Sequence, residues 1–323
     1  MEPSRTIPQS HSADLAVTYP WPTMPFKFKA VTAKTKRLID LGNQVIRDCR
    51  ALIAMGAGNQ VQDVASSQGR SHYFTSVVQK NRNYVWDRPL RNGGVTCAYG
   101  AGNCQDQAAV TYTILRSKLT AGENTSFCVN WAIKHSFATI GTPGTDPENE
   151  VICVDPWPIK PQALLLKDHF CKEGLKVLRS KPGGKNADYM ARLKKHAPKD
   201  AWIDRWAAPS SFDVDAITSG DGMWDHEYCS NDGIAWVYKV RATWIADNQR
   251  PRCHACNKEF GVTRWRHHCR SCGDVFCDAC STGRTAVGVP ATRPGEADVD
   301  LSNGAVRVCA PCLTQIKQEG LGG

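Results

Sequence analysis

Four C-x-x-C pairs in the last third of the chain restrict its fold more than any other feature. The pairs are Cys253/Cys256, Cys269/Cys272, Cys277/Cys280 and Cys309/Cys312. Two thiolates three positions apart converge on one point when a turn separates them, and a structural Zn²⁺ takes four such ligands in a tetrahedron. Only four residues separate the second pair from the third, against twelve between the first and the second. We therefore expect two interleaved, structural Zn²⁺ sites, with pairs one and three on one ion and pairs two and four on the other.

Three short motifs accompany these cysteine pairs. Trp244-Ile245-Ala246-Asp247 precedes the first pair, Arg266-His267-His268-Cys269-Arg270 contains part of the second, and Arg307-Val308-Cys309 opens the last. In this order they resemble the FYVE zinc finger family, over residues 241–318. The resemblance implies peripheral binding to endosomal membrane through phosphatidylinositol 3-phosphate. The residues that it assigns to the headgroup pocket are Trp244, Asp247, Arg266, His267, His268, Arg270 and Arg307.

The residue types in these motifs suit a phosphorylated headgroup, because the planar guanidinium of arginine binds a phosphate through two parallel hydrogen bonds. One position departs from the family, which usually has a basic residue where this chain has Trp265. With Val262 and Thr263 in the preceding turn, Trp265 would insert at the lipid interface, where aromatic rings are favoured. A RING-like finger that binds a protein partner is the alternative.

Composition limits what the other residues do. The finger takes only part of the 323 residues, and residues 36–240 form a segment long enough to bury a core of its own. Residues 1–35, which contain several prolines and serines, are expected to be disordered or loosely ordered. The net charge of +9 suits an acidic surface, but nucleic acid is not an expected partner, since no basic helix or aromatic sheet motif accompanies it. The seven remaining cysteines are odd in number and irregularly spaced, which favours a reducing compartment such as the cytosol.

A second informative stretch begins at Gly102-Asn103-Cys104. Apolar residues follow it at helical spacing, so Cys104 is predicted to lie in the first turn of a helix with Asn103 as its N-cap. Two strand patterns come next, residues 127–140 and 151–155. If they form an antiparallel hairpin centred near residue 145, His135 faces Asp155, because facing residue numbers then sum to 290. A slip of one residue would place the two side chains on opposite faces.

This order of residues resembles the papain-like and transglutaminase-like cysteine enzymes, and is also similar to bacterial effector deamidases of that fold. The resemblance implies an α+β thiol enzyme domain with Cys104 as nucleophile, His135 as general base and acid, and Asp155 as the residue that orients His135. The positive end of a helix and an adjacent imidazolium would stabilise the thiolate. Cys97 is the rival nucleophile.

The two resemblances together predict a cysteine-dependent hydrolase that acts on amides of a protein substrate at the endosomal membrane. Protease, deamidase and transglutaminase share one thioester chemistry, so the residues do not distinguish them. The combination also suggests a secreted bacterial effector that acts in a host cell. The alternative is a non-enzymatic phosphoinositide-binding adaptor with a degenerate papain-like domain.

Overall fold

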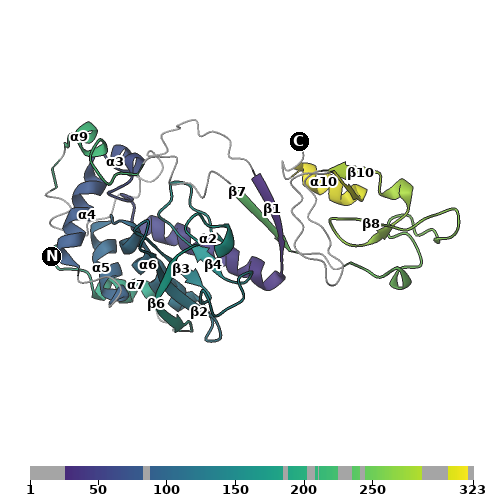
Figure 1. The fold of residues 1–323 in the computed structure, drawn as a ribbon, viewed down its shortest axis with the longest axis horizontal. Coiled ribbons are helices and arrows are strands. Elements are labelled where there is room, and N and C mark those ends of the chain that lie inside the picture. The colour runs from purple at the N-terminus through teal and green to yellow at the C-terminus, as the bar shows by residue number, and fades with distance from the viewer. Residues whose placement is uncertain are drawn as a thin grey trace, which may run out of the picture. The chain divides into compact units, whose positions relative to one another are not determined.

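The computed structural model describes residues 26–82, 88–184, 188–201, 208–209, 211–224, 235–240, 244–285 and 305–318 (Figure 1). Contacts within the chain divide it into two units. The larger unit takes its described residues from Leu38–Ile234, and the smaller takes them from Pro25–Arg37 and Ala235–Gly323. Each unit has its own fold.

A five-stranded antiparallel sheet forms the centre of the larger unit, with the strand order β5-β4-β3-β2-β6. Every residue of β3 is buried, as is every residue of β2 after its first. This burial explains their nearly continuous apolar and small sequences. The strands are β2 (Asn124–Asn130), β3 (His135–Ile140), β4 (Ile152–Val154), β5 (Leu164–Leu165) and β6 (Leu175–Pro182), and the short 3₁₀ helix η1 (Leu166–Asp168) follows β5.

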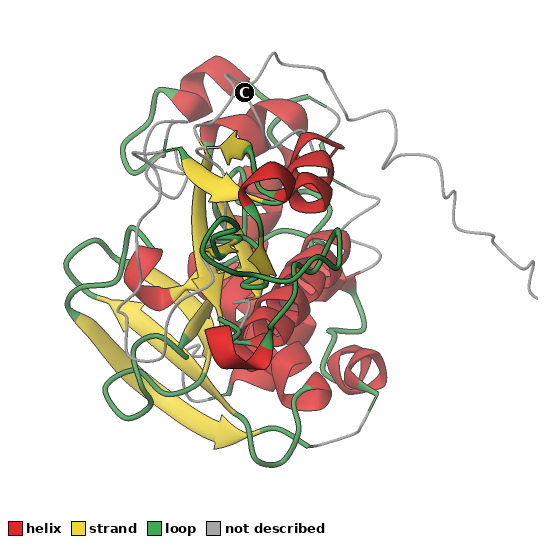
Figure 2. Cartoon of the chain, turned by 90° about the vertical axis from the view of Figure 1, so that its right-hand side faces the viewer, coloured by secondary structure: helices red, strands yellow, loops and turns green. Residues whose placement is uncertain are grey.

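Helices cover this sheet mainly from one side (Figure 2). Helix α6 packs on β2 and β3, and α5 packs on α4, α6 and α7. Phe74 and Val78 of α4 meet Val95 and Tyr99 of α5 in a buried cluster. The helices are α2 (Ala33–Leu52), α3 (Val61–Ser66), α4 (Arg70–Asn81), α5 (Pro89–Tyr99), α6 (Cys104–Lys118), α7 (Tyr189–Lys195) and α9 (Val214–Thr218).

The smaller unit contains a parallel strand pair and the cysteine-rich finger. Strand β1 (Phe26–Val31) pairs with β7 (Ala235–Val240), which joins segments more than 200 residues apart in sequence. The finger contains two small antiparallel pairs, β8 with β9 and β10 with β11, and ends in a helix. Its elements are η3 (Asp247–Gln249), β8 (His267–His268), β9 (Val275–Phe276), η4 (Asp278–Cys280), β10 (Gly283–Thr285), β11 (Val306–Val308) and α10 (Ala310–Gln318).

The mixed helix-and-sheet architecture agrees with the α+β prediction, but several elements differ. Strand β1 and the start of α2 lie inside the segment 1–35 that the sequence predicts to be loosely ordered. The stretch 127–140 is not one strand, because a turn at residues 131–134, with Lys134 at a positive φ of 53°, divides it into β2 and β3. These two strands form the hairpin, and β4 is the third strand in the series.

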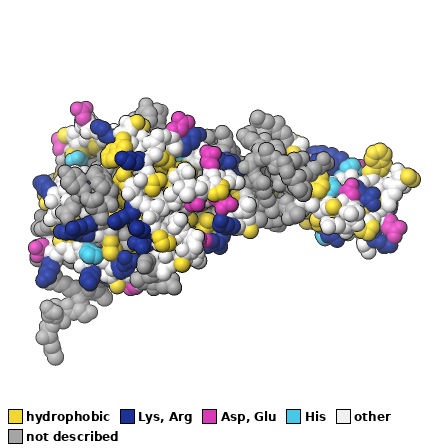
Figure 3. Space-filling view, turned by 60° about the horizontal axis from the view of Figure 1, so that its bottom comes forward, with side chains coloured by type: hydrophobic (Ala, Val, Ile, Leu, Met, Phe, Trp, Pro, Cys, Tyr) yellow, Lys and Arg dark blue, Asp and Glu magenta, His cyan; other side chains and the backbone are white. Residues whose placement is uncertain are grey.

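On the surface, Lys and Arg side chains outnumber acidic ones over the part of the larger unit that Figure 3 brings forward. Within the described residues, no helix combines the length and apolar character that crossing a membrane requires.

Candidate functional site

Helix α6 begins at Cys104, as the sequence predicts. The buried carboxylate of Asp106 in the first turn accepts a hydrogen bond of 3.0 Å from the backbone N–H of Asn103, the N-cap residue. Burial raises the pKa of Asp106, and the adjacent Arg82 guanidinium, with which it forms an ion pair, opposes that effect. These contacts fix the start of the helix and therefore the position of the Cys104 thiol. Cys104 as a whole is 7% exposed.

His135 and Asp155 meet, but not through the register that the sequence predicts. Ala138 faces Val154 across β3 and β4, so facing residue numbers sum to 292 rather than 290. A shift of two residues leaves every side chain on its original face. Asp155 follows the last residue of β4 and reaches His135 diagonally, with its Oδ2 atom 2.6 Å from the Nε2 atom of His135.

The electrostatics of this pair follow from its burial. Both residues are 1% exposed. Burial lowers the pKa of His135, but the charge and hydrogen bond of Asp155, together with a hydrogen bond to Cys104, raise it to about 10. Burial raises the pKa of Asp155, whereas His135 and then His169 hold it well below its usual range. At neutral pH the pair is an imidazolium and a carboxylate, with the thiol of Cys104 on the same imidazole ring.

His169, directly after η1, is a member of the cluster that sequence reasoning missed. Its Nε2 atom lies 3.3 Å from Oδ2 of Asp155. The backbone N–H of Cys171 donates to its Nδ1 atom at 3.3 Å, so the neutral ring carries its proton on Nε2, toward Asp155. The only sequence signal was a histidine in an apolar stretch. The structure places this histidine directly after β5 and η1.

Two histidines and a carboxylate are also a common set of metal ligands, and the ligand atoms of His135, Asp155 and His169 lie within 4.8 Å of one another. The distances favour a proton over a metal ion between His135 and Asp155. Two ligand atoms each about 2.1 Å from one ion lie roughly 3 Å apart or more, whereas these lie 2.6 Å apart.

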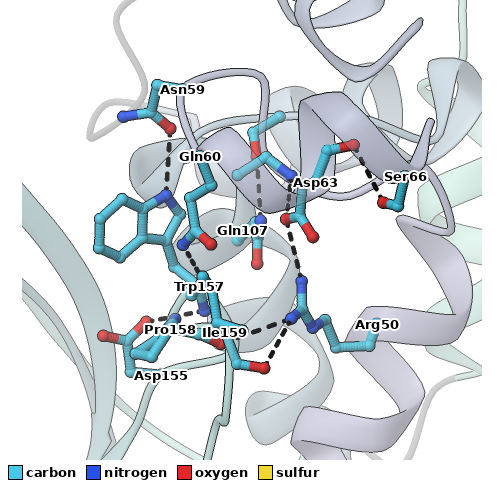
Figure 4. Close-up of polar contacts among 12 residues, drawn as sticks. Arg50, Asn59, Gln60, Asp63, Ser66, Gln107, Asp155, Trp157, Pro158 and Ile159 are labelled. Carbon is cyan, nitrogen blue, oxygen red and sulfur yellow. Dashed lines mark hydrogen bonds and ion pairs between the residues drawn. The ribbon is translucent and has the colours of Figure 1, made fainter. Parts of the chain in front are cut away.

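The loop after Asp155 is held from helices α2 and α3 (Figure 4). The indole N–H of Trp157 donates to the side-chain oxygen of Asn59 at 3.1 Å, and the side chain of Gln60 donates to the backbone oxygen of Trp157. Arg50 donates to two further backbone oxygens of the loop at 3.4 and 3.5 Å, and Asp63 pairs with Arg50 at 3.3 Å. The backbone N–H of Trp157 in turn donates to the other oxygen of Asp155 at 3.1 Å. The carboxylate is therefore positioned by a framework of buried and partly buried polar contacts.

The rival thiol does not share these features. Cys97 lies near the end of α5, not in a first turn, and burial raises its pKa. Burial likewise raises the pKa of Cys49, Cys128 and Cys171 to about 12. Among the described cysteines of the larger unit, Cys104 is the one at a helix start beside an imidazolium.

In the finger, the eight cysteines form the two interleaved clusters that the spacing predicts. Cys253, Cys256, Cys277 and Cys280 make one, and Cys269, Cys272, Cys309 and Cys312 make the other. Sulfur ligands about 2.3 Å from a tetrahedral Zn²⁺ lie about 3.8 Å apart, and the sulfurs of Cys256 and Cys277 are separated by 3.8 Å. Backbone N–H groups also donate to the sulfurs of Cys253 and Cys269 at 3.3 Å.

A basic hollow of about 400 Å³ lies beside the second cluster. Its wall is a stack in which the Trp244 ring lies 3.9 Å from the His268 ring and 4.4 Å from the Arg270 guanidinium. The lining residues are Trp244, Arg266, His267, His268, Arg270, Val306 and Arg307. Of the predicted headgroup residues, the structure thus leaves out Asp247, whose exposed carboxylate lies 3.7 Å from the Nε2 atom of His268. Val306 lines the hollow although the motifs did not indicate it.

The predicted membrane-insertion residues form a projecting tip. Gly261 pairs with Arg264 in a tight turn, with Val262 95% exposed and Trp265 72% exposed. Thr263 is exposed at the same tip. Two large apolar side chains this exposed on one turn suit contact with a nonpolar phase.

Comparison with known proteins concerns the finger. The family model of the FYVE zinc finger matches residues 243–318. The chain is 39% identical over 82 residues to Protein FREE1 of Arabidopsis thaliana, and 37% identical over 76 residues to RUN and FYVE domain-containing protein 1 of Homo sapiens. These matches cover 25% and 23% of this chain, but only 12% and 9% of the two relatives. The LM5-1 FYVE domain of Leishmania major is 30% identical, over 26% of this chain and 89% of that domain, with a TM-score of 0.20. Residues 243–318 are therefore a FYVE zinc finger, whose two four-cysteine clusters fit two structural zinc ions.

Proposed function

We propose that this chain is a cysteine-dependent hydrolase of protein amides, and that its finger places it on endosomal membranes that carry phosphatidylinositol 3-phosphate. One observation carries the enzymatic part. Cys104, His135 and Asp155 come from three separate elements and meet in one buried cluster, with a 2.6 Å hydrogen bond between His135 and Asp155. The Cys104 thiol donates to the backbone oxygen of Lys134, the residue before His135, at 3.7 Å, and Cys104 is among the groups that raise the pKa of His135.

The chemistry starts from an ion pair. The positive end of α6 and the imidazolium of His135 stabilise a thiolate at Cys104. The thiolate attacks the amide carbonyl carbon, and the C–N bond breaks as the leaving amine takes the proton from His135. Water then gives a proton to His135 and attacks the thioester, which releases the carboxylic acid and restores the pair of Cys104 thiolate and His135 imidazolium. The backbone N–H of Cys104, without a partner inside the helix, can donate to the developing oxyanion.

The lipid part of the proposal rests on the finger's basic hollow. Arg266, Arg270 and Arg307 line it together with two histidines. The guanidinium of Arg307 pairs with the carboxylate of Asp278 at 2.6 Å. Arg266 and Arg270 belong to the predicted phosphate-binding motif and line the same hollow, and they would make the main phosphate contacts. Burial and the nearby charge of Arg307 lower the pKa of His267, and a bound phosphate monoester would oppose both effects.

Membrane binding is tested with vesicles that contain phosphatidylinositol 3-phosphate. Arg266→Gln with Arg270→Gln should abolish sedimentation with these vesicles. Arg252→Gln with Lys258→Gln is the matched control, because it removes two exposed basic residues of the same finger that neither line the hollow nor lie in the projecting turn. Equal loss in both double variants would show a general charge effect and contradict a headgroup site.

The enzymatic part is tested by incubating proteins of a eukaryotic cell with the purified chain and with Cys104→Ala. Mass spectrometry should find new termini or deamidated side chains with the wild type alone, and Cys97→Ala is the matched control. Modification that survives Cys104→Ala would show that the proposed nucleophile is wrong.

A non-enzymatic adaptor is the second candidate, and the burial of the thiol favours it. Cys104 packs beneath Trp157, with Phe170 and Trp224 beside it, so a substrate must displace side chains to reach the sulfur. In an adaptor, the exposed Trp131 and Ile133 on the neighbouring turn would bind the partner. Rapid, selective alkylation of Cys104 by iodoacetamide at pH 6 would favour the enzyme, and no reaction would favour the adaptor.

A further inference from the structure

A second basic pocket lies in the larger unit, at the other end of α6 from Cys104. It has a volume of about 420 Å³, within the range of roughly 300–1,000 Å³ typical of small-molecule sites. Five arginines and a histidine line it, together with Pro89, Leu90, Tyr112 and Thr113, and no lining residue is acidic. The basic residues are Arg88, Arg91, Arg116, Arg179, Arg192 and His196.

These arginines converge from four elements. Arg88 and Arg91 flank the first turn of α5, Arg116 lies in the last turn of α6, Arg179 is on β6, and Arg192 is on α7. Since α5 and α6 pack on each other and on α7, folding itself brings the charges together. The positive end of the α5 dipole adds to them. Arginines gathered by packed elements repel one another unless an anion lies between them.

The pairing of these residues points to a ligand outside the chain. In the part of the chain that the structure describes, no carboxylate forms an ion pair with Arg88, Arg91, Arg116 or Arg192. Other arginines of the larger unit do have such partners, as Arg82 does in Asp106.

The second observation is a buried hydroxyl. Tyr112 lines the pocket and is 3% exposed, yet its hydroxyl has no hydrogen-bond partner among the described residues. Burial raises the pKa of Tyr112, and the charges of Arg116 and Arg179 act against that rise, so both guanidinium groups lie close to the phenol. A buried polar atom without a partner is costly unless a ligand or water supplies the hydrogen bond.

We propose that this pocket binds a small, multiply phosphorylated anion. Several phosphate monoesters on one compact molecule would satisfy arginines that approach from four directions, each through paired hydrogen bonds, and a phosphate oxygen would accept from the Tyr112 hydroxyl. The site is separate from the thiol cluster, because the twelve residues from Cys104 to Arg116 span about 18 Å of helix. The anion would tie α5, α6, α7 and β6 together, whatever reaction the thiol performs.

Binding is measured by calorimetry with inositol hexakisphosphate as the soluble probe, on the full chain carrying Arg266→Gln with Arg270→Gln, so that the finger does not contribute. We expect one site per chain and a higher melting temperature for the larger unit when it is filled. Arg116→Gln with Arg192→Gln should weaken binding at least about a hundredfold, because two charge-assisted contacts are lost. Arg47→Gln with Lys172→Gln, which removes two exposed charges outside the pocket, should leave binding unchanged.

Tyr112→Phe provides a second variant that removes only the hydroxyl, and it should weaken binding about tenfold. Vesicles with phosphatidylinositol 4,5-bisphosphate show whether the anion is a soluble molecule or a lipid headgroup. If the chain binds these vesicles but not the soluble probe, and the Arg116/Arg192 variant does not bind them, the anion is a lipid headgroup. Absence of binding to either probe, or binding that both variants retain, would overturn the proposal. A single-stranded oligonucleotide that binds more tightly than both probes would also overturn it.

Discussion

Replacing Asp155 by asparagine is the most direct test of the buried cluster, because it removes one charge and almost no volume. Asp155 accepts from His135 at 2.6 Å and from the backbone of Trp157 at 3.1 Å, and lies 3.3 Å from His169. With that charge removed, burial remains as the main influence on His135 and it lowers the pKa of the imidazole. At pH 7 the ring should therefore change from charged to neutral.

The size of the effect follows from the pKa of His135. The difference between an ordinary value of 6.5 and about 10 corresponds to roughly 4 kcal/mol of unfolding free energy at pH 7. The low pKa of Asp155 arises from the same ion pair, so its free energy is not counted a second time. Removing one partner of a buried ion pair costs about 3–5 kcal/mol in other proteins. Because asparagine can still accept one hydrogen bond, we expect a loss of about 3 kcal/mol.

The sign of the pH dependence is fixed by the direction of the change. Since folding raises the pKa of His135, this stabilisation is complete below about pH 6.5 and is lost as the pH rises through about 10. Urea unfolding of Asp155→Asn and of the wild type should therefore differ most between about pH 5 and 6.5 and converge by about pH 10. Asp200→Asn, at an exposed position, is the control and should match the wild type throughout.

Nuclear magnetic resonance of the imidazole nitrogens reads the charge state itself. His135 should be protonated on both nitrogens at pH 8 in the wild type and on one in Asp155→Asn. If the variant keeps a doubly protonated His135 at pH 8, or loses no stability, Asp155 is not what holds the charge and the account of the site is refuted. Modification of the target protein should fall at least about a hundredfold, as expected for groups that act as a unit.

Three further outcomes are expected. Metal analysis of the purified chain should find two zinc ions, and one zinc or none would contradict the interleaved pairing of the cysteines. Chelation should unfold the finger but not the larger unit, since zinc supplies about 10–16 kcal/mol per site in finger peptides. Val262→Asp with Trp265→Asp should weaken vesicle sedimentation while titration with a soluble inositol 3-phosphate headgroup stays unchanged, and a parallel loss in both would place these residues in the headgroup site. Gly42→Ala should destabilise the chain by about 1–3 kcal/mol in urea, because the added Cβ would lie 2.7 Å from that of Ala163; a gain in stability from the better helix propensity would show that α2 moves away freely.

The parts of the structure that sequence predicts well are those fixed by local chemistry. Tetrahedral zinc leaves few ways to combine four C-x-x-C pairs, so the spacing was sufficient to predict both clusters. The start of α6 was predicted equally well, because the N-cap preference of Asn103 acts within one helical turn. In the same way, the alternation of faces along a strand placed His135 and Asp155 on one side of the sheet even though the register is shifted by two residues.

What the sequence did not predict depends on contacts between distant segments. Residues 91–103 resemble a loop because they are rich in glycine and asparagine, yet residues 89–99 form α5, in which Asn92, Gly93 and Gly94 are buried. A Cβ on Gly94 would lie 2.6 Å from the backbone oxygen of Leu193 in α7, so glycine here allows close helix packing. The parallel pairing of β1 with β7 is equally non-local. Neither the packing of α5 on α7 nor the pairing of β1 with β7 can be detected from a short segment of the sequence, because each depends on residues far apart in the chain.

The two histidines that contact Asp155 have different chemical roles, and their partners decide which one can transfer a proton. His169 accepts the backbone N–H of Cys171 on Nδ1, and a nitrogen that accepts cannot also carry a proton. The proton of the neutral His169 ring therefore lies on Nε2, which is 3.3 Å from Oδ2 of Asp155. Asp155 accepts the Nε2 proton of His135 at 2.6 Å, and Cys104 is among the groups that raise the pKa of His135. His135 and then His169 lower the pKa of Asp155, and the charge of Asp155 in turn raises the pKa of His135. Of the two histidines that contact Asp155, His135 is therefore the one that would act as acid and base in the proposed reaction.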